Sequence, residues 1–231
     1  MKIVSNPKKI KRNYKIGLYT SLASLLFLFI AVGLTLTQSL DLTTYSFVAM
    51  LIGLVLSQIG VYFANRWGKS PRVDERITQS LKGLDDRYTL YHFTGPVPHL
   101  LTGPAGLWVL VPQYQGGVIT HDGKRFQQKG VGLFSRLVGQ EGLGRPDLEA
   151  QSYEADMSKF LENELDEQAR PPVRSIIVFT SPKASVQVSD TPTPTLHVEK
   201  LKDFIRRKAK EEPANMNAMK QVQDVLPEED I

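Results

Sequence analysis

The apolar residues of this chain gather in two long runs within its first third. Residues 16–36 and residues 45–65 contain no charged side chain. About 20 apolar residues in a helix cover the roughly 30 Å of hydrocarbon in a bilayer, where a helix satisfies its own backbone hydrogen bonds. The pattern therefore predicts a transmembrane helical hairpin over residues 16–65, with a short connection at 37–44.

Charged residues flank the two runs unevenly. Residues 1–15 carry six basic and no acidic side chains, and Arg66, Lys69 and Arg72 follow the second run, whereas Asp41 is the only charge in the connection. Because basic flanks stay in the cytoplasm, we expect a basic cytoplasmic N-terminus (1–15), a linker (66–73) and a cytoplasmic soluble domain. A cleaved signal peptide is the alternative for the first run, but that run is longer than an ordinary signal core and no small-residue cleavage site follows it.

Small side chains recur along the second run. Gly53, Ser57, Gly60 and Ala64 are spaced by four, three and four residues, which places them on one side of a helix where two backbones can approach closely. These positions predict packing against the first helix, with a homodimer interface as the alternative. Gln58 is the one strongly polar side chain at depth, and we expect it to form an interhelical hydrogen bond rather than line a transport path.

The pattern over residues 74–210 is that of a soluble α/β domain with a mixed sheet. Residues 107–111 form a continuous apolar run, which is typical of a central strand buried on both faces. Asp122-Gly123 between two short strand-like runs indicates an antiparallel hairpin. The predicted order is helix 74–84, strands 88–93, 106–111, 117–120 and 125–128, helix 147–168 with its acidic residues on a solvated face, strands 173–180, 185–188 and 195–198, helix 201–210, and a polar tail at 211–231 with at most a weak helix.

Composition narrows the chemistry that this domain can perform. The chain has 231 residues, a net charge of +4, no cysteine and four scattered histidines. Disulfides, thiolate zinc sites and cysteine nucleophiles are therefore excluded, and a histidine metal centre is disfavoured. Five glycines in residues 130–144 suggest a phosphate-binding loop, but the pattern GxxxxGK[ST] is missing, so a flexible loop that touches the membrane is the better interpretation.

The order of these elements resembles the nuclease-related domain (NERD) family, whose fold is similar to that of the PD-(D/E)xK nucleases. The resemblance covers residues 74–207 and rests on an acidic helix start at Asp74, the step His99-Leu100-Leu101, the turn Gly103-Pro104-Ala105-Gly106, and the strand that follows this turn. Gln151 resembles a later glutamine of the family. The resemblance implies a restriction-endonuclease-like α/β domain behind the transmembrane hairpin, in a bacterial plasma membrane.

In such nucleases, two carboxylates hold a divalent cation and a lysine positions the attacking water. The resemblance puts Pro98 at the aspartate, Val111 at the glutamate and Gln113 at the lysine, and none of these side chains can do that chemistry. Asp74 and Gln151 would be remnants of the site. We therefore expect a catalytically inactive binding or assembly module without a cofactor. The alternative is a nucleic-acid-binding protein or a Mg²⁺-dependent nuclease with shifted ligands.

A basic cluster lies at the end of the last predicted helix. It consists of Arg206, Arg207, Lys208 and Lys210. These side chains could meet nucleic-acid phosphates or anionic lipid, although cations at the carboxyl end of a helix are favourable without any ligand. The expected partners are the lipid bilayer and another protein, with nucleic acid and a second copy of the chain as alternatives.

Overall fold

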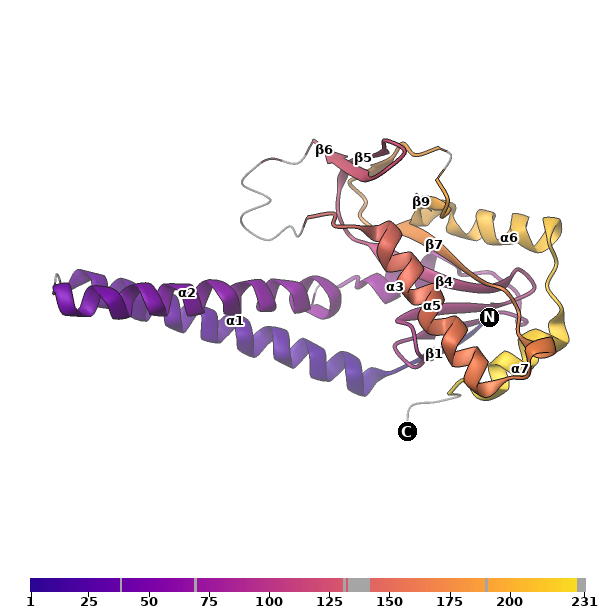
Figure 1. Ribbon diagram of the computed structural model, residues 1–231, viewed down its shortest axis with the longest axis horizontal. Helices are drawn as coiled ribbons and strands as arrows, with labels where there is room; N and C mark the ends of the chain where they lie inside the picture. Colours follow the sequence, from indigo (N-terminus) through magenta and orange to yellow (C-terminus); the bar gives the residue numbers. More distant parts are fainter. Residues whose placement is uncertain (38, 69, 131, 133–141, 190, 228–231) are drawn as a thin grey trace. The chain divides into compact units, whose positions relative to one another are not determined.

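The chain divides into two compact units. The computed structural model describes every residue except 38, 69, 131, 133–141, 190 and 228–231. One unit is Lys8–Arg72, and the other joins Met1–Pro7 to Val73–Ile231. Figure 1 labels many of the helices and strands of both units.

The first unit is a pair of long apolar helices. They are α1 (Pro7–Leu36) and α2 (Leu40–Phe63), and a short π-helix, η1 (Ala64–Gly68), follows α2. Both helices are long and apolar enough to cross a membrane, which confirms the two predicted helices. Large apolar side chains such as Phe29 and Leu51 point outward and are more than half exposed. Helix α1 begins nine residues before the apolar run because the basic residues of the flank continue the same helix.

The inner faces of α1 and α2 contain small residues. Gly53 lies against Leu28, Gly60 against Ser21, and a Cβ atom added at Gly53 would lie 2.9 Å from Leu28 Cγ. The hydroxyl of Ser24 donates a hydrogen bond of 2.9 Å to the carbonyl of Gly53. These close contacts leave little room for a larger side chain at Gly53 or Gly60, and both glycines pack against α1.

Some of the other polar side chains of the hairpin form hydrogen bonds with described residues, and others do not. The hydroxyl of Ser46 donates to the carbonyl of Ala31 at 2.8 Å and lies 2.7 Å from the hydroxyl of Thr35. Ser57 and Ala64 are half-buried. The interhelical hydrogen bond predicted for Gln58 is wrong, because its side chain is exposed and no described residue forms a hydrogen bond with it.

The second unit is built on a six-stranded mixed sheet. The strand order is β1-β2-β3-β4-β7-β9, and the strands are β1 (Lys2–Ser5), β2 (Thr89–His92), β3 (His99–Gly103), β4 (Gly106–Gln113), β7 (Val173–Phe179) and β9 (Thr195–His197). Strands β2, β3 and β4 are antiparallel neighbours, whereas the pairs β1–β2, β4–β7 and β7–β9 are parallel. The expected mixed sheet, with β4 among its inner strands, is confirmed.

The second unit also contains a smaller sheet, which includes the predicted hairpin. Its order is β6-β5-β8, with β5 (Gly117–His121), β6 (Phe126–Lys129) and β8 (Ala184–Val186). The carboxylate of Asp122 accepts hydrogen bonds from the backbone N–H groups of Lys124 and Arg125, and Gly123 has a φ of +87°. The Asp-Gly turn is therefore confirmed, but its two strands do not belong to the main sheet. The glycine-rich loop predicted at 130–144 lies largely outside the described residues.

Helices cover both faces of the six-stranded sheet (Figure 1). Helices α5 (Pro146–Glu164) and α7 (Met216–Val225) pack with Leu107, Val109 and Val111 on one face, and α3 (Val73–Ser80) and α6 (Leu201–Glu211) pack with Trp108 and Leu110 on the other. Two short 3-10 helices, η2 (Glu167–Ala169) and η3 (Val198–Lys200), precede β7 and α6. Alternate residues of β4 thus enter different cores, which explains its unbroken apolar run.

Three elements differ from the predicted boundaries. Strand β1 lies within the segment expected to be a basic N-terminus, β3 begins at the step His99-Leu100-Leu101, and α7 lies within the expected polar tail. Helix α7 is capped by Asn215, whose side-chain oxygen accepts from Asn217 N at 2.9 Å, and it buries Met219. The domain therefore extends beyond residue 210, because this helix completes one core.

Candidate functional site

Polar side chains gather at one edge of the six-stranded sheet. Strands β1, β2, β4, β7 and β9 all run in the same direction and end there, and antiparallel β3 begins there. We call this edge the carboxyl edge and define it by His92, His99, Gln113, Thr180 and His197. Ligands of α/β sheets usually bind outside the carboxyl ends of the strands, so this edge is the candidate site.

A carboxylate is held at the end of β4. Gln113 is 5 % exposed, and its side-chain nitrogen donates to Glu149 Oε2 of α5 at 2.9 Å. The phenol of Tyr153, one turn further along α5, donates to Glu149 Oε1 at 3.1 Å. Both oxygens of Glu149 therefore accept hydrogen bonds from neutral groups, which fixes the carboxylate in place.

The end of β7 joins this group to α3. The N–H and hydroxyl of Thr180 donate to the Gln113 carbonyl at 2.7 and 3.2 Å, and Arg76 of α3 donates to the Thr180 carbonyl at 3.1 Å. These contacts connect α3, β4 and β7 through backbone oxygens. These hydrogen bonds stabilise the carboxyl edge. They also occupy the hydroxyl of Thr180, which donates to the Gln113 carbonyl.

The three positions singled out by the resemblance lie at this same edge. Because Leu100 of β3 pairs with Val109 of β4 in an antiparallel register, Pro98 comes before β3 at the end where β4 reaches Val111. Val111 is fully buried and Gln113 nearly so. The edge therefore offers two hydrocarbon side chains and one amide where a metal-dependent nuclease needs oxygen ligands and a cation.

The remaining predicted site residues are separated by the sheet. Asp74 is 5 % exposed in the first turn of α3, which packs on one face, and Gln151 is exposed on α5, which packs on the other. Within the described residues, no group of three or more His, Asp or Glu side chains could hold a metal ion.

Glu149 is the site residue that the sequence interpretation missed. It was included in the solvated acidic face of the long helix, although Glu149, Tyr153 and Met157 recur every four residues along one stripe. Met157 is fully buried on that stripe. This spacing was the signal that Glu149 faces the sheet.

Two buried histidines lie next to each other at the β2–β3 turn. His92 Nδ1 and His99 Nδ1 are 2.8 Å apart, and His92 Nε2 is 2.9 Å from the hydroxyl of Thr78. The two residues are 2 and 3 % exposed. Burial, and then the neighbouring His92, lower the pKa of His99 well below its usual value. Near neutral pH, His99 is therefore the uncharged member of this hydrogen-bonded contact.

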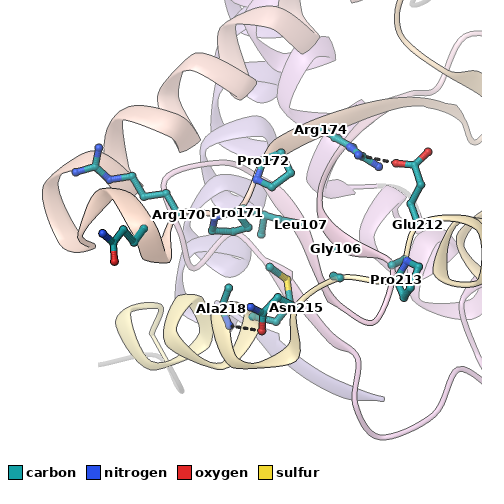
Figure 2. A pocket seen from close by; sticks show the side chains of 14 residues that line it. Gly106, Leu107, Arg170, Pro171, Pro172, Arg174, Glu212, Pro213, Asn215 and Ala218 are labelled. Carbon is teal, nitrogen blue, oxygen red and sulfur yellow. Dashed lines mark hydrogen bonds and ion pairs between the residues drawn. The ribbon is translucent and has the colours of Figure 1, made fainter.

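A separate cavity of about 350 Å³ lies at the opposite, amino-terminal edge of β4 and β7. Figure 2 shows Arg174 turned toward Glu212, and Pro171 and Pro172 are among the other residues that line the cavity. The Arg174–Glu212 ion pair measures 2.6 Å, and Arg170 Nε donates to the carbonyl of Leu165 at 2.8 Å. Both arginines thus already have acceptors from the chain itself.

The predicted basic cluster is split between paired and unpaired side chains. Arg207 lies 3.7 Å from Glu211, and Lys208 lies 3.0 Å from Glu211 and 3.4 Å from Glu212. Lys210 has no hydrogen-bond or ion-pair partner among the described residues. Arg206 and Lys210 line a cavity of about 650 Å³ together with Arg87. Arg206 also donates to the Gly83 carbonyl at 3.0 Å, and Arg87 is paired with Asp85 at 2.7 Å.

Comparison with protein-family models, with curated proteins and with solved structures found no match to this chain. The NERD resemblance therefore stays a prediction.

Proposed function

We propose that this chain is an integral membrane protein of the bacterial plasma membrane whose cytoplasmic, NERD-like α/β domain is a non-catalytic binding or assembly module. The observation that carries the proposal is the chemistry at the end of β4. Val111 and Gln113 occupy the positions where the resemblance requires Glu and Lys, and the amide of Gln113 holds Glu149. Neutral donors that fix a carboxylate make an ordered surface but supply neither a metal site nor an activated nucleophile.

The membrane part of the proposal is supported by two observations. The outward-facing side chains of α1 and α2 are apolar over the length of a bilayer span. Strand β1 precedes α1 in the chain, yet it pairs with β2, which follows α2. Since the two flanks of the hairpin meet in one sheet, they must lie on the same side of any membrane that the helices cross. The basic flanks favour the cytoplasmic side.

A fractionation experiment tests the anchor. The full chain should stay in the membrane pellet after alkaline carbonate extraction and be released only by detergent. Release by carbonate alone would contradict the membrane part of the proposal, whatever the domain binds.

A nuclease assay tests the absence of catalysis. The full chain, purified in non-ionic detergent, is incubated with supercoiled DNA and with single-stranded RNA in Mg²⁺ or Mn²⁺. We expect no cleavage above that of the variant Glu149→Gln. Metal-dependent cleavage that disappears in Glu149→Gln or Asp74→Ala, but persists when the exposed Asp156 of α5 is changed to Asn, would overturn the proposal in favour of a nuclease with shifted ligands.

The binding role is tested by covalent capture in native membranes. Chemical cross-linking followed by purification of the tagged chain should recover a defined protein partner. We expect Glu149→Ala, which removes the fixed carboxylate at the carboxyl edge, to reduce the yield of that partner, while Asp156→Ala leaves it unchanged. Recovery of the chain with lipid alone would contradict an assembly role.

Contact with nucleic acid is a second candidate, and the cavity lined by Arg87, Arg206 and Lys210 favours it. Phosphate contacts make binding weaken as salt rises, with about one unit of log-log slope lost for each contact removed. Lys210→Gln should therefore weaken binding to a short DNA and lower the slope by about one, whereas Lys208→Gln, whose charge already faces Glu211 and Glu212, should do little. Binding that is insensitive to salt would exclude this candidate.

A further inference from the structure

The outer face of α2 carries a seam of large side chains that nothing in the hairpin covers. Phe47, Leu51 and Leu54 are 60, 59 and 48 % exposed, and Gln58 follows them on the same face. Their spacing of four, three and four residues is the heptad spacing by which two helices pack side by side. We call these four residues the outer seam.

Gln58 distinguishes this seam from an ordinary lipid-facing surface. Lipid tails can cover Phe47, Leu51 and Leu54, but they offer no hydrogen bond to an amide. Gln58 lies seven residues before Asn65, or about 10 Å along the helix axis at the rise of an α-helix. A glutamine side chain is shorter than that distance, so the amide stays within the apolar layer if α2 spans the membrane.

The inner face of α2 cannot supply the missing partner. Gly53 and Gly60 on that face are already in contact with Leu28 and Ser21 of α1. Gln58 is exposed, and among the described residues none forms a hydrogen bond with its amide. The partner must therefore come from outside the hairpin and must present a polar group at the same depth.

We infer that the outer seam is the interface of a parallel homodimer in the membrane, in which the Gln58 amides of two copies hydrogen-bond to each other. An amide is both donor and acceptor, so it is complementary to its own copy. A two-fold axis along the membrane normal puts the same residue of the partner at the same depth. One polar residue within an apolar heptad seam also sets register and the number of helices. The inference rests on the membrane-spanning part of the proposed function.

Disulfide cross-linking tests this geometry directly, because the natural chain has no cysteine. The variant Leu54→Cys places a thiol on the outer seam. The matched control is Leu26→Cys, which is 59 % exposed on α1 and close in depth, since Leu28 contacts Gly53. In membranes that contain the full chain at low density, mild oxidation should convert Leu54→Cys into a covalent dimer and leave Leu26→Cys monomeric.

The role of the amide is tested in the same background. Polar contacts between membrane helices contribute enough that Gln58→Leu should weaken association roughly three- to thirty-fold. Gln58→Asn, which keeps an amide, should restore most of it. Association is measured by energy transfer between copies labelled at Lys124→Cys, on an exposed turn, as the ratio of lipid to protein is increased in liposomes.

Three results would overturn the inference. They are a monomeric wild-type chain at every lipid ratio, equal cross-linking of Leu54→Cys and Leu26→Cys, and association of Gln58→Leu that equals the wild type. A chain that resists carbonate extraction yet gives one of these results refutes only the homodimer. A chain that carbonate releases refutes the membrane anchor itself, so the two failures are distinguishable.

Discussion

The buried side chain of His99, beside His92, predicts that acid destabilises the second unit. Burial, and then the nearby His92, lower the pKa of His99 in the folded protein. Between that lowered pKa and the unfolded value near 6.5, the unfolded chain binds more protons than the folded one. The stabilisation is therefore complete above about pH 6.5 and is lost as the pH falls below it.

The size of the effect follows from one proton. A single group contributes at most about 1.4 kcal/mol per pH unit to the free energy of unfolding. Since burial lowers the pKa of His99 well below its usual value, lowering the pH from 7.5 to 5.5 should remove up to about 1.4 kcal/mol of the free energy of unfolding. For a unit of this size, that loss corresponds to a fall in melting temperature of about 3 to 6 °C.

The assay is thermal unfolding of the full chain in non-ionic detergent, followed by near-ultraviolet circular dichroism at several pH values. His99→Gln keeps a polar group beside His92 but does not titrate. The acid-induced fall in melting temperature should therefore shrink by the contribution of about one proton. His121→Gln, in the β5–β6 turn and away from the pair, is the matched control and should keep the wild-type slope. Equal slopes for the wild type and His99→Gln would refute the reasoning.

Three further predictions concern contacts that define the unit. Val4→Asp puts a charge where β1 has its buried side chain, 4 % exposed, and should lower the melting temperature and speed hydrogen exchange in β2. Gln113→Leu removes one of the two hydrogen bonds described for Glu149 and leaves the one from Tyr153. It should lower the free energy of unfolding in urea by about 1 to 3 kcal/mol, whereas unchanged stability would mean that the Gln113–Glu149 pair contributes nothing. Met219→Ala should lower the free energy of unfolding by about 2 to 5 kcal/mol, and Asn215→Ala should lower it by about 1 kcal/mol. Unfolding midpoints equal to that of the wild type would show that α7 does not belong to the core.

The elements that could be predicted from the sequence are those in which the pattern of apolar residues extends over many positions. Residues 107–111 of β4 alternate between two cores and leave no polar position, and the long helix α5 repeats its apolar side over several turns. Strand β1 offers no such pattern, because Val4 is its one buried side chain. Helix α7 buries Met219 and Val222 among polar neighbours, and these few apolar residues are too sparse to establish a period.

The candidate site likewise contains one part that could be predicted from the sequence and one part that could not. The place of Gln113 at the end of β4 could be predicted, because it follows from the length of one strand and from the resemblance. Its bond to Glu149 could not, since that contact depends on how α5 crosses the sheet, which no local pattern encodes. The same is true of His92 and His99, which become neighbours only when β2 and β3 pair in register.

Strand β1 also supports the proposed uncleaved anchor over a cleaved signal peptide as the interpretation of the first apolar run. A signal peptide would be removed together with the residues before it, and the six-stranded sheet would then lose β1 and its pairing with β2. Tyr91 would lose Val4, which belongs to the same core. An uncleaved anchor keeps the sheet complete, because the chain leaves the sheet after Ser5 and returns to it at Thr89. For the same reason, a fragment that starts at Val73 lacks the edge strand β1 and exposes the edge of β2.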